Sequence, residues 1–304
     1  MKKKIILAGG SGFLGRPLAA ALEERGYETI TLTRTPRPGA ANQVLWDGKI
    51  PSTWSEILEG AEAVVNLTGR SVNCRHNREN RREIIESRTG SVHAIAAAIA
   101  RCHTPPKTWV QAGSLAIYGD AGNAWCDEAT APGNGFAAET CVLWERAFLD
   151  AVAPATRKVM LRISFALGHG GGALETLAGL TRAFLGGPVG TGRQFISWIH
   201  NADRLNMFIW AIERDDVSGI FNATGPDPVT NADFMRELRR ALRRPWSPPV
   251  PAWLVRAGAW TLGTEPSLAL TGRRGRPCRF EELGFEFQFP HIGPALEGLY
   301  WKKI

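Results

Sequence analysis

Residues 5–15 read Ile-Ile-Leu-Ala-Gly-Gly-Ser-Gly-Phe-Leu-Gly, a short apolar run followed by a glycine-rich turn. The apolar run is typical of a strand that is buried on both faces of a parallel sheet, and the residues after Gly15 have helical periodicity. Here Gly9 allows a tight turn, Gly12 lets the backbone approach a pyrophosphate, and Gly15 lets helix and strand pack closely. The helix start also offers free N–H groups and a positive dipole end to phosphates. The stretch therefore predicts a dinucleotide site, the alternative being a glycine turn without a ligand.

The first half of the chain alternates between strand and helix patterns. Strands are expected at residues 28–33, 44–46, 63–67, 109–112 and 158–164, and helices at residues 78–100 and 137–152. Such repeated units predict an α/β fold with a Rossmann-type doubly wound parallel sheet and a smaller C-terminal lobe. We expect an NADP(H)-binding domain over residues 1–170, completed by a strand near residues 219–223. Residues 171–304 are expected to form the substrate-side segment and the helical C-terminal lobe.

Composition excludes several classes of protein. The chain has 304 residues, 44% hydrophobic content and a net charge of +7, and no apolar run is long enough for a membrane helix. The positive charge lacks a compact basic cluster with interleaved aromatic residues, so we expect no nucleic-acid partner. The five cysteines are widely spaced, which argues against a disulfide framework or a metal site and favours a cytoplasmic location.

The glycine spacing is G-x-x-G-x-x-G, and Gly-Gly-Ser-Gly-Phe-Leu-Gly resembles the extended, epimerase-like branch of the short-chain dehydrogenase/reductase superfamily. Trp46-Asp47 after the third strand is similar to the adenine-facing Asp of that superfamily, although Asp47 is equally typical of a turn before glycine. Asn66-Leu67-Thr68-Gly69 is similar to the motif that ends the fourth strand and lines the cofactor. The resemblance thus predicts a cofactor site at residues Gly9, Ser11, Gly12, Phe13, Leu14, Gly15, Trp46, Asp47, Leu67, Thr68 and Gly69.

The end of the second predicted strand indicates which nicotinamide cofactor is bound. Folds that prefer NAD usually place Asp or Glu here to accept a hydrogen bond from the ribose 2′-hydroxyl. This chain instead has Thr33-Arg34, with no carboxylate. Arg34 would give a 2′-phosphate a charge-assisted bond, so the sequence favours NADP(H), the alternative being a solvated loop charge.

The usual catalytic pair of the superfamily, Tyr-x-x-x-Lys, is absent. The tyrosines are Tyr27, Tyr118 and Tyr300, and none has a lysine four residues further on. Ser114 takes the position of the catalytic serine that polarises a substrate carbonyl, in a segment similar to the Ser-x-x-x-Tyr-Gly of the epimerases. Ser114 and Tyr118 are therefore the first catalytic candidates. Further candidates for the proton donor are the side chains of Asp120, Glu139, Cys141 and His200.

The missing pair narrows the resemblance to an atypical branch, often named "epimerase family protein", in which Tyr and Lys are also replaced. Matching residues run almost end to end and include Ser87-Arg88, Trp144-Glu145 and Arg162. The resemblance implies NADP(H) binding through Thr33, Arg34, Leu67, Thr68, Glu83, Arg88 and a backbone contact near Ala166. For Glu83 a solvated helix face is an equal alternative.

The most specific match is the glycine-rich segment 185–200, which in extended epimerases faces the phosphates of the substrate. Arg193, Trp198 and His200 are its substrate-side candidates. For Trp198 the alternative is a core anchor, and for His200 it is a cap for the helix that follows.

Two functions remain open from the sequence. One is an NADP(H)-dependent oxidoreductase or epimerase-like enzyme for a small polar metabolite, with a nucleotide sugar as one candidate. The other is a catalytically weak or inactive NADP(H) sensor that acts through a protein partner. A homodimer is an expectation that the resemblance suggests.

Overall fold

The computed structural model describes residues 2–301, and its centre is a parallel sheet of seven strands in the order β11-β7-β5-β4-β1-β2-β3. The strands are β1 (Lys4–Ala8), β2 (Glu28–Thr33), β3 (Gln43–Leu45), β4 (Ala63–Asn66), β5 (Thr108–Ser114), β7 (Arg157–Ile163) and β11 (Gly219–Ala223). Residues 5–8 of β1 are fully buried, as the central place of that strand requires. The predicted fold class is thereby confirmed.

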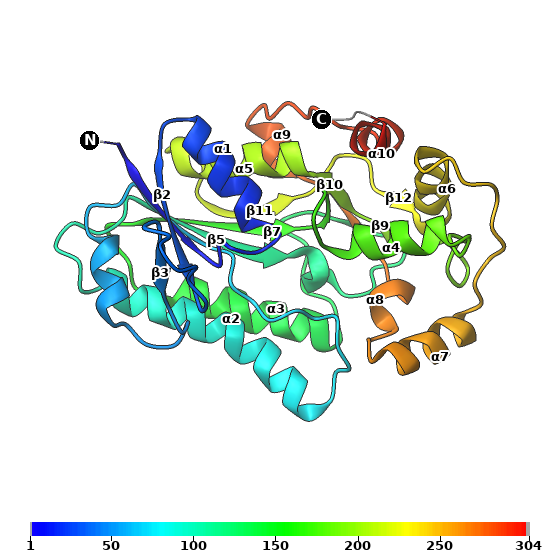
Figure 1. Cartoon of the computed structure of the whole chain (residues 1–304), viewed down its shortest axis with the longest axis horizontal. Helices are drawn as coiled ribbons and strands as arrows, with labels where there is room; N and C mark the ends of the chain where they lie inside the picture. Colours follow the sequence, from blue (N-terminus) through cyan, green and yellow to red (C-terminus); the bar gives the residue numbers. More distant parts are fainter. Residues whose placement is uncertain (1, 302–304) are drawn as a thin grey trace.

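Helices cover both faces of the sheet (Figure 1). Helices α1 (Gly15–Glu24) and α5 (Asn201–Glu213) lie on one face, and α2 (Arg78–Ile99) and α3 (Phe136–Asp150) lie on the other. The start of α2 is fixed by the side chain of Asn77, which accepts a hydrogen bond from the backbone N–H of Asn80 (2.8 Å). Two short 3₁₀ helices, η1 (Thr53–Leu58) and η2 (Leu115–Tyr118), follow β3 and β5.

The second half of the chain forms a lobe at one end of the sheet (Figure 1). Its helices are α4 (Ala173–Arg182), α6 (Asn231–Ala241), α7 (Ala252–Leu262), α8 (Ser267–Leu270), α9 (Cys278–Glu282) and α10 (Ile292–Tyr300), of which α9 packs on β11 instead. Trp198, Phe234 and Leu296 belong to a second apolar core in this lobe.

Three short strand pairs lie outside the main sheet, and the first and third of them join the two halves of the chain. They are β8 (Phe165–Leu167) with β10 (Trp198–His200), β9 (Phe195–Ile196) with β12 (Val229–Thr230), and β6 (Trp125–Cys126) with β13 (Arg274–Gly275). Because α5 and β11 also return to the main sheet, the second half contributes a strand and a helix layer to the first. The division at residue 170 stays a prediction.

Among residues 2–301, no helix is long and apolar enough to cross a membrane. The structure describes no group of three or more His, Cys, Asp or Glu side chains within this range that could hold a metal ion.

The contact between α1 and the loop before it predicts a sharp sensitivity at Gly15. A Cβ atom there would lie 2.5 Å from the Cα atom of Gly10, and backbone cannot move aside cheaply. We expect Gly15→Ala to lower the free energy of unfolding by about 1–3 kcal/mol, measured by urea denaturation. Gly179 in α4 is the matched control, since a Cβ there meets nothing within 4 Å and Gly179→Ala should be neutral or slightly stabilising. Equal effects of the two substitutions would contradict the packing argument.

Candidate functional site

The candidate cofactor site lies where the strand order of the sheet reverses. The chain moves outward from β1 through β2 to β3 and then returns to β4 on the other side of β1. The loops after β1 and β4 therefore meet at the carboxyl edge of the sheet, the usual place for ligands in doubly wound folds. They touch directly, because a Cβ atom on Gly9 would lie 3.2 Å from the carbonyl carbon of Leu67.

The glycine loop is shaped for close approach by a ligand. Gly9 has φ of 78°, which favours glycine, and the nearest atom to a Cβ on Gly12 would be the carbonyl oxygen of Gly9, at 3.4 Å. Leu14 caps α1 without a side-chain hydrogen bond, and the first turn has no acidic residue. The N–H of Gly15 and the positive dipole end of α1 are thus available to an anion, whereas Arg16 donates its N–H to the carbonyl of Gly12 (3.0 Å) and Pro17 has no N–H. The Phe13 ring lies against Gly171 and Gly172, where a Cβ would come within 3.2 Å of it.

At the end of β2, Thr33 and Ser11 lie together, with their hydroxyl oxygens 3.3 Å apart. Arg34 is exposed, and within residues 2–301 the structure records no hydrogen bond or ion pair for its side chain. Its guanidinium is therefore available to a ligand at this edge.

The residues predicted after β3 have ordinary structural roles in the described contacts. Asp47 is exposed, and its Oδ1 accepts backbone hydrogen bonds from Lys49 (2.9 Å) and Ile50 (3.4 Å), as in a turn. Trp46 is 3% exposed and packs against Trp54, with ring centroids 5.4 Å apart. The Trp46 side chain is thus a core residue and does not line an open surface.

The end of β4 is held by a buried amide network. The Asn66 side chain donates to Ser91 Oγ (3.1 Å) and Gln111 Oε1 (3.0 Å) and accepts from the Thr68 N–H (3.1 Å). This network fixes the Leu67–Gly69 loop. The Thr68 hydroxyl oxygen is buried and has no partner among the described residues, so a ligand group at this point would satisfy it.

Helix α2 brings Arg88 to the same loop. The Nη1 of Arg88 donates to the carbonyl oxygens of Arg70 (3.1 Å) and Ile84 (3.0 Å), and its guanidinium lies 5.2 Å from the ring centroid of Trp144. A Cβ on Gly69 would lie 3.2 Å from the central carbon of this guanidinium. Burial lowers the pKa of Arg88, and within residues 2–301 it has no ion-pair partner. Glu83 by contrast pairs with Arg70.

Ser114 ends β5, and its Oγ accepts the backbone N–H of Ala116 (3.1 Å). Because that bond uses a lone pair, the hydroxyl proton of Ser114 is free for a ligand. The serine is half-buried at the carboxyl edge, where the superfamily places it.

Tyr118 is placed differently from our prediction. It is 3% exposed, and its hydroxyl group bonds to the carbonyl of Asp127 (2.7 Å), to Asn222 Oδ1 (2.8 Å) and to the Arg162 guanidinium (2.7 Å). Burial raises the pKa of Tyr118 to about 12 despite the adjacent guanidinium. A buried hydroxyl that already has three hydrogen-bond partners is poorly placed to exchange protons with a substrate, so this geometry favours a structural role, and the catalytic role of Tyr118 stays a prediction.

The same guanidinium forms a buried ion pair. Arg162 Nε and Nη2 donate to the two carboxylate oxygens of Glu145 at 2.8 and 2.9 Å, and both residues are 5% exposed. The sequence supplied these two residues only as family markers, because their pairing across α3 and β7 has no signal in sequence spacing.

Aligning α3 with the family by Glu145 puts Ala137 at the position of the missing tyrosine and Cys141 at that of the missing lysine, and neither is a base. Ala137 is exposed, and Cys141 is buried, which raises the pKa of its thiol to about 12. Cys141 therefore stays a neutral thiol near neutral pH. Glu139 is exposed on the same helix, and Asp120 Oδ1 accepts the backbone N–H of Gly272 (3.0 Å).

The three substrate-side candidates differ in exposure and in the contacts that they make. Arg193 is exposed, whereas Trp198 is 1% exposed and donates its indole N–H to the carbonyl of Asp227 (2.8 Å). His200 Nδ1 accepts the N–H of Ala202 (3.2 Å) at the start of α5. Trp198 is thus a core anchor and His200 a helix cap, the alternatives weighed for each. Ala166 lies in β8, paired with Ile199 of β10.

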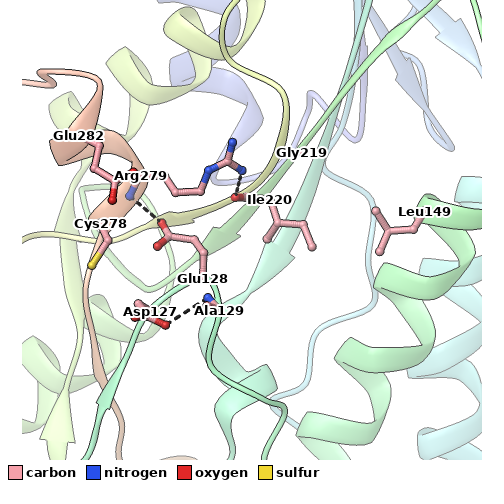
Figure 2. Close-up of a pocket in the computed structure, with 9 residues that line it drawn as sticks. All are labelled: Asp127, Glu128, Ala129, Leu149, Gly219, Ile220, Cys278, Arg279 and Glu282. Carbon is pink, nitrogen blue, oxygen red and sulfur yellow. Dashed lines mark hydrogen bonds between the residues drawn. The ribbon is translucent and has the colours of Figure 1, made fainter.

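A pocket of about 560 Å³ lies away from this edge, beside the edge strand β11 (Figure 2). There Glu128 Oε1 accepts the backbone N–H of Asn222 (2.9 Å), and Arg279 donates to the carbonyls of Ser218 (2.9 Å) and Ile220 (2.5 Å). These side chains occupy the unpaired backbone groups of the edge strand. Since no residue of the loops at 9–15 or 67–69 lines the pocket, we assign it to the edge of the sheet and not to the cofactor site.

Comparison with known proteins agrees with this geometry. A model of the NAD dependent epimerase/dehydratase family matches residues 5–224, and a model of a domain of unknown function, DUF1731, matches residues 250–299. The chain belongs to the NAD dependent epimerase/dehydratase family. Its family resemblance, stated from sequence motifs, is confirmed.

Relatives from distant organisms match this family member almost end to end. Epimerase family protein SDR39U1 of Mus musculus is 33% identical over 97% of this chain and 98% of its own length. Epimerase family protein YfhF of Bacillus subtilis is 30% identical, with 97% of each chain covered.

Two solved structures are similar in fold and sequence. The crystal structure of human SDR39U1 (isoform 2) with NADPH has a TM-score of 0.87 and 31% identity, covering 98% of this chain and 99% of that one. The nucleoside-diphosphate sugar epimerase from Corynebacterium glutamicum has a TM-score of 0.80 and 30% identity, covering 99% of this chain and 59% of that one.

The buried cap at His200 predicts a pH effect on stability. Burial lowers the pKa of His200 to about 4, below the value of about 6.5 in an unfolded chain. The unfolded state therefore binds a proton between pH 6.5 and 4 that the folded state does not, and stability falls as pH falls through this window. The free energy of unfolding of the wild type should fall between pH 7 and 4.5. In His200→Asn, which can still cap α5, this fall should be smaller by up to about 2–3 kcal/mol, measured by urea denaturation.

The exposed His93 in α2 provides the control for this comparison. His93→Asn should leave the pH dependence of stability as in the wild type. If His200→Asn and the wild type lose stability in parallel, His200 is not the titrating group.

Proposed function

We propose that this protein binds NADP(H) at the β1–β4 edge and acts as an oxidoreductase or epimerase-like enzyme on a small polar metabolite. The single observation that carries the cofactor choice is the unpartnered, exposed Arg34 at the end of β2, where no carboxylate follows the strand. A guanidinium at this position favours a ribose 2′-phosphate over a 2′-hydroxyl, because only the phosphate forms a charge-assisted pair with it.

The residues at the edge fit a dinucleotide in three further ways. The N-terminus of α1 is free for a pyrophosphate, and the backbone of Gly12 is open to one. The buried Thr68 hydroxyl lacks a partner that a cofactor group would supply. Human SDR39U1, crystallised with NADPH, supports the same assignment through its similarity over nearly the whole chain.

The bound nicotinamide would supply hydride exchange, and the protein would orient and polarise the substrate. Ser114 is proposed to donate its free hydroxyl proton to a substrate carbonyl or hydroxyl oxygen. Arg88 is proposed to provide the fixed positive charge that Lys supplies in typical relatives, because its guanidinium lies against the Gly69 loop without a carboxylate partner. Glu83, Leu67 and the backbone near Ala166 remain predicted cofactor contacts.

A nucleotide sugar is the substrate that we propose to test first. The support is the name of the C. glutamicum relative, a nucleoside-diphosphate sugar epimerase that is 30% identical to this chain. Homodimer formation and a cytoplasmic location stay predictions.

The second candidate function is a weak or inactive enzyme that senses NADP(H) and acts through a protein partner. The observation that favours it is the lack of a group suited to proton transfer at the usual positions. Tyr118 and Cys141 both have a pKa of about 12, far from the range in which general acid–base catalysis is effective.

Titration of the purified protein with NADPH and NADH tests the cofactor assignment. We expect Arg34→Asp to weaken NADPH binding about tenfold or more, as lost charge-assisted hydrogen bonds would, and to leave NADH binding equal or improved. Arg101→Asp is the matched control, because Arg101 is exposed near the opposite edge of the sheet. Equal loss of both cofactors in Arg34→Asp would refute its 2′-phosphate role, and no binding to the wild type would refute the proposed function.

Turnover distinguishes the enzyme from the sensor. With NADP⁺ and a panel of nucleotide sugars, we expect turnover by the wild type and a loss of about 100-fold or more in Ser114→Ala, the usual cost of removing a donor to developing charge. NADPH affinity should change less than about twofold, because Ser114 acts on the substrate. A wild type that binds NADPH, turns over nothing and changes its affinity for a protein partner would favour the sensor.

A further inference from the structure

A strand from the DUF1731-matching segment passes beside Leu115, the residue that follows Ser114. The backbone of residues 272–275 is fixed on both sides, since Gly272 donates its N–H to Asp120 (3.0 Å) and Arg273 donates its N–H to the carbonyl of Phe195 (3.0 Å). Ser197 Oγ donates to the carbonyl of Arg273 (2.9 Å) and accepts the N–H of Gly275 (2.8 Å). This part of the chain is therefore held in one register against the first half.

The alternation of side chains along this strand decides where Arg273 points. Arg274 lies over the rings of Trp125 (3.8 Å) and Phe195 (4.7 Å), and Arg276 lies over the same Trp125 ring (4.9 Å). Gly275 faces the other way, because a Cβ there would lie 2.4 Å from the Leu115 side chain. Strand β13 is only Arg274–Gly275, and extending its alternation by one residue would place Arg273 on the Leu115 side with Gly275.

The Leu115 side is the candidate catalytic side. Leu115 follows Ser114 directly and packs in one apolar cluster with Cys126 and Cys141. Cys141 occupies the position of the missing lysine on α3. The electrostatics agree with this placement. The positive charge of Arg273, like those of Arg88 and Arg162, lowers the pKa of Cys141 against the larger effect of burial, as a charge near that thiol would.

The Arg273 side chain has no ion-pair partner within residues 2–301. It is half-buried, and the structure records no hydrogen bond or ion pair for its guanidinium among the described residues. Asp120, the nearest acidic group acting on it, accepts from a backbone N–H and forms no ion pair with it. Glu145 is occupied by Arg162. Burial lowers the pKa of Arg273, so a ligand anion would offset the cost of the partly desolvated charge.

We propose that Arg273 binds an anionic group of the substrate, a phosphate or a carboxylate, beside Ser114. The inference rests on the proposed function and names the chemistry of its substrate. The DUF1731-matching segment then completes the active site with a bidentate guanidinium, the group suited to planar or tetrahedral oxyanions. Arg273 would fix one end of the substrate while Ser114 polarises the reacting oxygen.

The test is calorimetric titration of the NADP⁺-saturated protein with two dianions, inorganic phosphate and malonate, at constant ionic strength. We expect the wild type to bind one of them and Arg273→Gln to weaken that binding about tenfold or more. Arg276→Gln is the matched control, since it removes the same charge from the opposite face of the same strand, and it should bind as the wild type does. Binding of phosphate alone indicates a phosphorylated substrate, and binding of malonate alone indicates a carboxylate.

The proposal is overturned if neither dianion binds to the wild type, or if Arg273→Gln and Arg276→Gln have the same affinity. Should Arg273→Gln fail to fold, Arg273→Lys replaces it, with weaker binding expected and wild-type affinity overturning the proposal. The NADPH affinity of the same samples separates the two hypotheses. A wild type that binds NADPH without binding a dianion defeats only this inference, and one that does not bind NADPH defeats the proposed function.

Discussion

The buried guanidinium of Arg162 is the interaction on which the arrangement of the site depends. It forms two hydrogen bonds with Glu145 of α3 and a third with the Tyr118 hydroxyl of η2. Tyr118 in turn bonds to Asn222 of β11, whose amide donates to the carbonyl of Arg276 (2.9 Å). One charged group on β7 thus connects α3, η2, β11 and the residue that follows β13. Removing either charge would leave the other buried and unpaired, which is far more costly than the pair itself.

This network also explains how a family member can lack the usual tyrosine and lysine and keep its architecture. The Tyr118 hydroxyl is used to hold β11 and η2 together, and Cys141 fills the lysine position with a small buried side chain. In our proposal the positive charge near Ser114 comes instead from arginines on other elements, Arg88 on α2 and Arg273 just before β13. An arginine stays charged under partial burial, where a lysine would lose its proton more readily. The fold can therefore place cations here without depending on one helix.

Much of the fold could be predicted because its signals are local. The glycines of residues 9–15 and the apolar strands identified the sheet, and the predicted strand at residues 28–33 has the observed bounds of β2. The return of β11 to the sheet edge was expected near the right residues. The packing of α5 on the main sheet was not expected, because residues 201–213 follow the glycine-rich segment that the sequence assigns to the second lobe. Among site residues, Arg34 and Ser114 lie where their motifs indicate, since Arg34 directly follows β2 and Ser114 is the last residue of β5.

The sequence by itself determined the α/β class, the glycine loop and the absence of a Tyr-x-x-x-Lys pair, since each depends on residues that are neighbours in the chain. Tertiary structure alone decided that Tyr118 is buried under Arg162, that Trp46 and Trp198 are core residues, and that His200 caps a helix. It also brought the segment that carries Arg273, more than 150 residues from Ser114 in sequence, against Leu115. The physical reason is that burial, charge pairing and the direction of a side chain depend on contacts between distant segments. Such contacts leave no periodic pattern in a single sequence.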